Sequence, residues 1–363
     1  MSQFNDVTAI VLAAGKGTRM KSAKPKVLHE VLGMPMLKWV LEAVHGAGVE
    51  DQTIILSQDH QGFENFLNDF PEVSIAVQPT QQGTGDAVSS AACAFKNVKT
   101  PSYSKGVLQR GKQKNASERM WTLIVAGDTP AISSQTLKDF IGAVKGSGKK
   151  LGVLGTRMPD PRGYGRLVCS QQKTLARIVE ERDADLETKK INLCNTGVIV
   201  AQTEYLFELL SQVTPNNAQN EYYLTDIFSI SADREHLAFV YETAIPTEFS
   251  GINDRGQLES LENWMLDKKM AQLMLSGVTI HRSQSVYLEG SVKIEADTEI
   301  FPQVVLTGDT RIARNCTIGP GAMIQDSHLS AGVVVGSSAV IVRSQIEAGR
   351  VIPAGAVIVD SVS

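Results

Sequence analysis

The chain has 363 residues, of which 42% are apolar and 20% charged, as is typical of a soluble globular protein of about two domains. Its 35 basic and 39 acidic residues leave a net charge of −4, which argues against nucleic acid or an anionic membrane as the main partner. The first residues lack the pattern of a signal peptide, and no apolar run approaches the roughly 18 residues of a membrane span. The four cysteines and six histidines show no metal-ligand spacing. We therefore expect a cytoplasmic protein without disulfides or zinc.

Up to about Ile252, short aliphatic runs alternate with helical patterns, which predicts an α/β domain with a mostly parallel sheet over residues 1–252. The predicted strands are Val7–Ala13, Thr53–Ser57, Ser74–Val77, Trp121–Val125, Leu151–Thr156, Thr196–Ala201 and Leu237–Tyr241. The predicted helices are Pro35–His45, Gly85–Phe95, Ser133–Val144, Glu204–Gln212 and Glu221–Ala232.

Within this region, the stretch from Lys96 to Arg119 has another composition. It carries seven basic residues against the single acid Glu118, with few apolar residues. We interpret it as a solvated, mobile surface loop, and the alternative is a basic flap that attracts an anionic substrate or partner.

A different pattern begins after Ile252. Residues 253–277 carry Leu and Met at rough helical spacing, which predicts a connecting helix over Gln257–Leu275. In residues 278–363 a six-residue period predicts a short left-handed parallel β-helix of about four coils, with three hexads in each coil. The residues expected to point inward are Leu288, Ile294, Ile300, Leu306, Ile312, Ile318 and Ile324, then, after a slip, Val334, Val340, Ile346, Ile352 and Ile358.

A glycine-rich segment follows the first predicted strand: Leu12-Ala13-Ala14-Gly15-Lys16-Gly17-Thr18-Arg19-Met20, with Pro25-Lys26 soon after. Small residues let backbone N–H groups approach a phosphate closely, and Arg19 and Lys26 add positive charge. The segment has Met20 where the dinucleotide fingerprint needs its third glycine, and the sequence contains no Gly-Lys-Ser/Thr ending of a Walker A loop. It therefore indicates a triphosphate-binding loop of another type.

This segment resembles that of the sugar-1-phosphate nucleotidylyltransferases. Further motifs follow in the order of that family: Gln78 with Gly83-Thr84-Gly85, Ala126-Gly127-Asp128-Thr129-Pro130, Gly163-Tyr164-Gly165-Arg166, Ile178-Val179-Glu180, Asn195-Thr196-Gly197, Asn217-Ala218-Gln219, Glu221-Tyr222-Tyr223 and Gly251-Ile252-Asn253-Asp254-Arg255. The closer match is the uridylyltransferase half of the bacterial bifunctional N-acetylglucosamine-1-phosphate uridylyltransferase/glucosamine-1-phosphate acetyltransferases. It covers most of residues 7–280 and continues into the repeat. The resemblance implies a Rossmann-like nucleotidyltransferase domain over residues 1–252.

The resemblance also implies a role for each matching residue. It places UTP against Leu12, Ala13, Ala14, Gly15, Lys26, Gln78, Gly83 and Thr84. It places the sugar phosphate against Gly127, Gly165, Glu180, Asn195, Thr196 and Tyr223. Asp128 and Asn253 match the pair that binds Mg²⁺, and their oxygen ligands suit that ion.

The implied reaction is in-line attack of the sugar 1-phosphate oxygen on the α-phosphorus of UTP, which gives UDP-N-acetylglucosamine and releases pyrophosphate. Because this nucleophile is already an anion, the reaction needs no general base. Catalysis then rests on positioning and on charge neutralisation by Mg²⁺, with Arg19 and Lys26 as the catalytic side chains.

Several of these residues also have a simpler interpretation. Asp128 can cap a helix, Asn195 can occupy a turn, and Glu180 can pair with Arg182 or Arg177 on the surface. Their joint occurrence in the order of the family favours the binding site.

Two features depart from the bifunctional proteins. Those proteins are much longer and carry their acetyltransferase site in later coils, whereas His281 and His328, the histidines of this repeat, match no part of that site. We therefore expect no acetyltransferase activity from this chain, and we expect a homotrimer formed through the β-helix. The second departure is the basic stretch 96–119, which is an insertion relative to the family.

Two alternatives stay open. One is a nucleotidylyltransferase for another hexose 1-phosphate or another base, and the other is a non-catalytic regulatory paralogue. The presence of Arg19, Lys26, Asp128 and Asn253 counts against the paralogue, because a protein that only binds has no need of both metal ligands.

Overall fold

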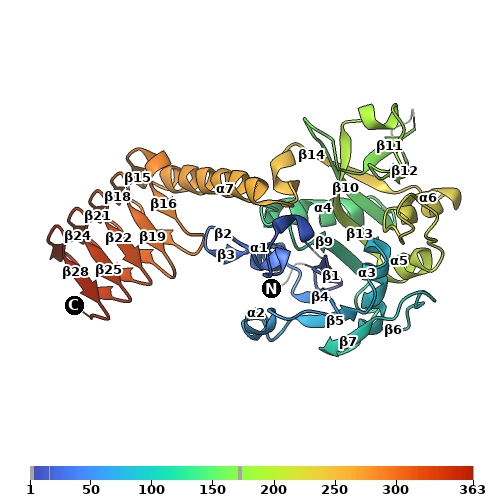
Figure 1. Ribbon diagram of the computed structural model, residues 1–363, viewed down its shortest axis with the longest axis horizontal. Helices are drawn as coiled ribbons and strands as arrows, with labels where there is room; N and C mark the ends of the chain where they lie inside the picture. Colours follow the sequence, from blue (N-terminus) through green and yellow to red (C-terminus); the bar gives the residue numbers. More distant parts are fainter. Residues whose placement is uncertain (1–3, 16, 171–173, 363) are drawn as a thin grey trace. The chain divides into compact units, whose positions relative to one another are not determined.

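A computed structural model describes residues 4–15, 17–170 and 174–362 of the chain. The chain divides into two compact units, which are both visible in Figure 1. The N-terminal unit comprises Met1–Leu28 and Met36–Asn253, and the C-terminal unit comprises His29–Pro35 and Asp254–Ser363. Within the described ranges, no helix combines the length and the apolar character needed to cross a membrane.

Four parallel strands form the centre of the sheet in the N-terminal unit, in the order β9, β1, β4, β5. They span Trp121–Ala126, Val7–Leu12, Asp51–Ser57 and Ser74–Gln78, respectively. Most of their residues are buried, as expected where helices cover both faces of a parallel sheet. In β1, Val7, Ala9 and Val11 face one hydrophobic core, and Ile10 faces the other. The predicted mostly parallel α/β fold is confirmed at this centre.

Further strands extend this centre on both sides. β13 pairs antiparallel with β9, β10 pairs antiparallel with β13, and β14 runs parallel to β10. A hairpin of β11 and β12, which the sequence did not predict, joins β13, and β7 forms the opposite edge beside β5. These strands span Val107–Arg110 (β7), Leu151–Arg157 (β10), Arg166–Cys169 (β11), Leu175–Val179 (β12), Leu193–Gln202 (β13) and Phe239–Thr243 (β14).

Helices cover both faces of the sheet (Figure 1). Residues of α1 and α4 belong to one core, whereas residues of α3, α5 and α6 belong to the other. Ser133 caps α4, because its hydroxyl accepts a hydrogen bond from the Thr136 N–H at 3.2 Å. The helices span Met36–Gly46 (α1), Glu64–Asn68 (α2), Thr84–Ser90 (α3), Ser134–Gly146 (α4), Thr203–Leu210 (α5) and Asp226–Asp233 (α6).

Two predicted helices differ in length from the observed ones. The helix predicted over Gly85–Phe95 ends at Ser90 and continues as the 3-10 turn Ala91–Ala94. The helix predicted from Glu221 begins only at Asp226, because the preceding segment runs beside α3. There the Tyr222 N–H donates to the Gln82 carbonyl at 2.7 Å, and the Tyr222 carbonyl accepts from the Gly85 N–H at 2.7 Å.

The basic stretch 96–119 is only in part the solvated loop that the sequence predicts, because short strands fold parts of it onto the unit. Its strand β7 forms an edge of the main sheet, and two short strands, β6 (Phe95–Lys96) and β8 (Lys114–Asn115), pair with each other. From β7, the Arg110 guanidinium donates to the carbonyl groups of Leu67, Phe70 and Val73 at 3.0, 2.6 and 2.9 Å.

Two more side chains fasten this stretch to the unit. Lys114 forms an ion pair with Asp51 and is largely buried. The ring of Tyr103 stacks on that of Tyr222, with centroids 3.8 Å apart. The cations bind carbonyl and carboxylate oxygens supplied by distant segments, and charge composition cannot reveal such partners.

Three stacks of short parallel strands form the β-helix of the C-terminal unit. The first contains β15 (Thr279–Ile280), β18 (Glu299–Ile300), β21 (Thr317–Ile318), β24 (Val334–Val335) and β27 (Val351–Ile352). The second contains β16 (Tyr287–Leu288), β19 (Val305–Thr307), β22 (Met323–Gln325), β25 (Val340–Val342) and β28 (Val357–Val359). The third contains β17 (Lys293–Ile294), β20 (Arg311–Ile312), β23 (His328–Leu329) and β26 (Gln345–Ile346). The predicted left-handed β-helix is confirmed, and its interior is aliphatic.

The structure corrects the phase of the repeat after Ile324. Val334, which the sequence places inward, is 39% exposed, whereas its neighbour Val335 is buried. Likewise Ile341, not Val340, is the fully buried residue of β25. The inward residue after Ile324 is Leu329, five positions later, so the period slips by one. Where two aliphatic residues are adjacent, the period alone does not say which one points inward.

The C-terminal unit also contains α7 and a hairpin. Helix α7 spans Arg255–Leu275, where the sequence predicts a helix. The hairpin consists of β2 (Glu30–Val31) and β3 (Met34–Pro35) and was not predicted. At its tip, the Leu32 N–H donates to the Glu262 carboxylate at 2.8 Å, and the Leu32 carbonyl accepts from the Gly290 N–H at 2.8 Å. A segment from early in the sequence thus packs with the helix and the first coil of this unit.

Candidate functional site

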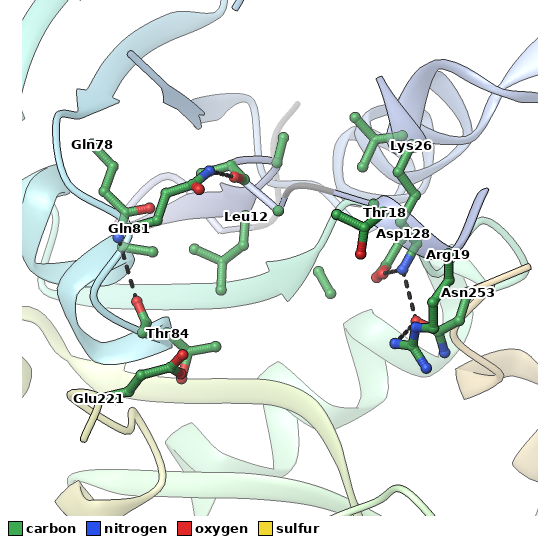
Figure 2. A pocket seen from close by; sticks show the side chains of 18 residues that line it. Leu12, Thr18, Arg19, Lys26, Gln78, Gln81, Thr84, Asp128, Glu221 and Asn253 are labelled. Carbon is green, nitrogen blue, oxygen red and sulfur yellow. Dashed lines mark hydrogen bonds and ion pairs between the residues drawn. The ribbon is translucent and has the colours of Figure 1, made fainter. Parts of the chain in front are cut away.

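A cavity of about 550 Å³ opens at the carboxyl ends of the central parallel strands, where α/β proteins bind their ligands. Eleven of the predicted site residues line it: Leu12, Ala13, Ala14, Gly15, Arg19, Lys26, Gln78, Gly83, Thr84, Asp128 and Asn253. It is also lined by residues that we did not predict: Gly17, Thr18, Val27, Gln81, Ala87, Ala126 and Glu221. Figure 2 shows that Arg19, Lys26, Asp128 and Asn253 lie at one end, the charged end, whereas the glutamines and Glu221 lie at the other.

The glycine-rich segment forms one wall of the cavity. Gly17 has a φ of +58°, and a Cβ atom there would lie 2.5 Å from the Cβ of Lys26. Glycine therefore permits both the left-handed turn and the close approach of the Lys26 segment. Thr18–Met20 and Lys26–Leu28 form short 3-10 turns that carry Arg19 and Lys26 to the cavity. Lys16, in the predicted loop, lies outside the described residues.

Two cations and two oxygen-bearing side chains meet at the charged end (Figure 2). Lys26 Nζ donates to Asp128 Oδ2 at 2.5 Å and to Asn253 Oδ1 at 3.0 Å. Arg19 Nη2 donates to the same Asn253 oxygen at 2.7 Å. Asp128 follows β9, and the preceding Gly127 N–H donates to the Leu12 carbonyl at 2.9 Å, which ties the two loops together. Among the described residues, no group of three or more His, Cys, Asp or Glu side chains could hold a metal ion.

The other end of the cavity is built from β5 and the start of α3. Gln78, the last residue of β5, donates from Nε2 to the buried Asp86 carboxylate at 2.6 Å. Gln81 donates to the Ala14 carbonyl and so joins this end to the glycine-rich segment. At Gly83, which has a φ of +113°, a Cβ atom would lie 2.6 Å from the Tyr222 carbonyl oxygen, so glycine is required for this close approach.

The predicted sugar-phosphate residues do not line this cavity, but several of them lie together. The Asn195 N–H donates to the Gly165 carbonyl at 2.8 Å, and a Cβ atom at Gly165 would lie 3.4 Å from the Glu180 carboxylate. The Thr196 hydroxyl is used within the protein, because it donates to the Leu154 carbonyl at 2.7 Å.

Carboxyl groups surround Glu180. Burial raises the pKa of Glu180, and a hydrogen bond of 2.9 Å from the Thr225 hydroxyl lowers it in part. Burial, together with the charges of Glu180 and Asp183, raises the pKa of Asp226 to about 6. Burial and the same carboxylates also raise the pKa of the Tyr223 hydroxyl, which therefore stays neutral. These groups suit hydrogen bonds to hydroxyl and amide groups better than contacts with a phosphate.

Several of the residues that sequence reasoning missed had a signal in the sequence. Gly17 and Thr18 lie in the glycine-rich segment, Ala126 and Glu221 lie in matched motifs, and Gln81 lies between Gln78 and the Gly83-Thr84-Gly85 motif. Asp86 had no such signal, because an acidic residue in the first turn of a helix is common in any protein.

Comparisons with known proteins agree with this geometry. Residues 9–189 match the MobA-like NTP transferase domain. The bifunctional protein GlmU of Geobacter metallireducens is 36% identical over 90% of this chain and 64% of its own length. The GlmU protein of Syntrophomonas wolfei is 32% identical over 88% of this chain and 67% of its own length. The chain therefore spans about two thirds of these curated relatives.

A solved structure supports the fold. A Bacillus anthracis protein described as a glucose-1-phosphate thymidylyltransferase superposes with a TM-score of 0.53, over 71% of this chain and 94% of its own. Its sequence identity is 18%, so this likeness concerns the fold alone. The sequence relatives and the family match show that the chain belongs to the GlmU family and carries a nucleotidyltransferase domain.

Proposed function

We propose that this protein transfers a uridylyl group from UTP to N-acetyl-α-D-glucosamine 1-phosphate and releases pyrophosphate. A phosphate oxygen of the sugar attacks the α-phosphorus of UTP, and the bond from that phosphorus to the oxygen bridging the β-phosphorus breaks. The observation that carries the proposal is the composition of this cavity. It combines a glycine-rich segment, an amide side chain, two cations and a carboxylate at the carboxyl edge of a parallel sheet.

The two cations are the side chains that would meet the triphosphate. Lys26 and Arg19 already point into the cavity and share the Asn253 oxygen. Phosphate oxygens would offer both cations stronger, charge-assisted hydrogen bonds than an amide oxygen does. Their charge would then neutralise the negative charge that develops on the leaving pyrophosphate.

The same end of the cavity fits a divalent metal ion, and we propose that this ion is Mg²⁺. Asp128 and Asn253 present a carboxylate and an amide oxygen in one place, and both bond to the Lys26 ammonium. Mg²⁺ prefers such hard oxygen ligands and takes only one or two from the protein, since it keeps waters and substrate phosphates in its shell. When bound, the ion supplies charge neutralisation and orientation of the phosphates.

We place the sugar near Glu180, Asn195 and Tyr223. Glu180 is half-buried and its Oε1 accepts from the Thr225 hydroxyl, and the carboxylate can also accept from sugar hydroxyl groups. The Asn195 amide can both donate and accept, which suits an N-acetyl group. Gly127, Gly165 and Thr196 would contribute through their backbone and through close packing.

The first experiment measures pyrophosphate release from UTP and Mg²⁺ with N-acetylglucosamine 1-phosphate, beside glucosamine, glucose and galactose 1-phosphates. Release with the N-acetylated sugar alone supports the proposal. Release with another sugar would keep the reaction and change the substrate, whereas no release with any sugar or nucleotide would favour a regulatory paralogue. In a parallel arm with acetyl-CoA and glucosamine 1-phosphate, we expect no acetyl transfer from the 363-residue chain.

We further propose that the protein is a homotrimer formed through the β-helix. Several outward residues of the strand stacks are exposed and apolar, among them Val334, which is 39% exposed, and Val351, its partner in the next coil, which is 66% exposed. Exposed aliphatic residues in neighbouring coils favour association between copies. Sedimentation should give three times the protomer mass, and a mass of one protomer would contradict the trimer.

A further inference from the structure

Asp86 holds the side chain of Gln78 in a single orientation. It lies in the first turn of α3, and both side chains are almost fully buried, with 2% and 3% of their surface exposed. Gln78 Nε2 donates to Asp86 Oδ2 at 2.6 Å, and the Gln82 N–H donates to the same oxygen at 3.2 Å. The carboxylate thus lies behind the cavity wall and bonds to a residue of that wall.

The chemistry of Asp86 decides which face Gln78 turns to the cavity. An ionised carboxylate can only accept hydrogen bonds, so the amide group of Gln78 must present its NH₂ to Asp86. The second neighbour of Nε2, the Gly83 carbonyl at 3.4 Å, is an acceptor too. Inverting the amide would therefore bring its oxygen against two other oxygens. As a result, the Gln78 oxygen is directed into the cavity (Figure 2).

We propose that Asp86 is a positioning residue that makes the cavity select, among pyrimidine nucleotides, those that carry an N–H at ring position 3. The inference rests on the proposed binding of a nucleotide in this cavity. Uracil and thymine have a hydrogen-bond donor at N3, which the fixed Gln78 oxygen can accept. Cytosine has a lone pair at N3, which that oxygen repels. A buried group built to accept from a ligand N–H discriminates strongly against an analogue that lacks it.

The wild-type protein tests the orientation of Gln78 directly. Binding of UTP, 5-methyl-UTP, 3-methyl-UTP and CTP would be measured by titration calorimetry. We expect similar Kd values for UTP and 5-methyl-UTP, and Kd values about tenfold or more higher for 3-methyl-UTP and CTP. Equal binding of UTP and 3-methyl-UTP would overturn the inference.

The variant Asp86→Asn tests whether Asp86 sets this orientation. Its amide can donate to the Gln78 oxygen, so Gln78 can invert and turn its NH₂ toward the cavity. We expect the preference for UTP over CTP in kcat/KM to fall about tenfold. We expect this change to lie in KM, with kcat at saturating UTP nearly unchanged, because Asp86 touches no reacting atom.

The matched control is Asp139→Asn. On the exposed surface of α4, Gln135 Nε2 donates to Asp139 Oδ1 at 2.8 Å, which is the same pair of groups away from the cavity. This control should keep the wild-type preference. If Asp86→Asn also keeps the preference for UTP over CTP, the inference is wrong. If that variant does not fold, the comparison of UTP with 3-methyl-UTP in the wild type decides whether Gln78 has the proposed orientation. Failure of the proposed function looks different, because the wild type would then release no pyrophosphate with any sugar phosphate.

Discussion

Two lysine–aspartate pairs in the N-terminal unit have nearly the same local geometry and different expected roles. At the cavity, Lys26 Nζ lies 2.5 Å from Asp128 Oδ2, and these side chains are 12% and 28% exposed. In the other pair, Lys114 contacts Asp51, and the side chains are 10% and 19% exposed. Contact and burial therefore do not distinguish the proposed catalytic pair from the structural one.

The position on the sheet does distinguish them. Asp128 follows the carboxyl end of β9, at the edge where α/β sheets bind ligands. Asp51 begins β4 and lies beside Thr8 near the amino end of β1. Around Lys114 the partners are fixed parts of the sheet, since its ammonium also donates to the Thr8 and Thr53 hydroxyls at 3.2 and 2.8 Å. The partners of Lys26 instead line a cavity, where a ligand can replace them.

The largest effect is expected for Asp128→Ala. Loss of the carboxylate removes the proposed metal ligand, so turnover should fall about 10³-fold or more. The fold should persist, because Lys26 keeps its hydrogen bond to Asn253. Pyrophosphate release at saturating substrates measures the first effect, and circular dichroism the second. Full activity in this variant would refute the assignment of Asp128.

Lys26→Met should also reduce turnover with little effect on stability. The methionine keeps the apolar stem and removes the charge that would neutralise the leaving group, so kcat/KM should fall about 10²-fold. The thermal midpoint should stay close to that of the wild type, because the lost ion pair faces an open cavity. A fall in stability as large as that expected at Lys114 would erase the distinction between the two pairs.

The two lysine–aspartate pairs also differ in how far the sequence could predict them. The glycine-rich segment, Gln78, Asp128 and Asn253 lie in motifs with a fixed order, so their meeting in one cavity was predictable. The six-residue period predicted the β-helix, because every coil repeats one local geometry. It did not predict which of Val334 and Val335 points inward, since both are aliphatic.

The sequence did not predict the polar pairs between distant segments. Lys114 looked like one more cation in a solvated loop, yet its partners come from β1 and β4, more than sixty residues earlier in the sequence. The role of Asp86 was equally unpredictable from the sequence, because it depends on the hydrogen bond from the Gln78 amide. A single sequence records residue types and spacing, whereas such partners are chosen by the tertiary fold.

Lys114→Met should lower the free energy of unfolding and leave kcat/KM nearly unchanged. Burial lowers the pKa of Lys114, and the charge of Asp51 opposes that shift, so the pair depends on mutual neutralisation. Without the lysine, Asp51 keeps Arg119, and the loss should be about 2 kcal/mol, with a thermal midpoint roughly 4–8 °C lower. The kcat/KM value should stay within about twofold. The matched control is Lys112→Met at an exposed lysine of the same stretch, which should change neither property.

The smallest effect is expected for Arg119→Ala. This variant measures how Lys114 and Arg119 share the neutralisation of Asp51 in the cluster that these three residues form. Arg119 Nε donates to Asp51 Oδ2 at 2.8 Å, and its side chain is 35% exposed, so its loss alone should reduce stability by about 0.5–1 kcal/mol. In the Lys114→Met background, Arg119 is the remaining cation on Asp51, and its loss should therefore cost about 1 kcal/mol more. Chemical denaturation of both single variants and the double variant gives this coupling. Additive effects would mean that the two cations act independently, and Asp51 would then not be the centre of the cluster.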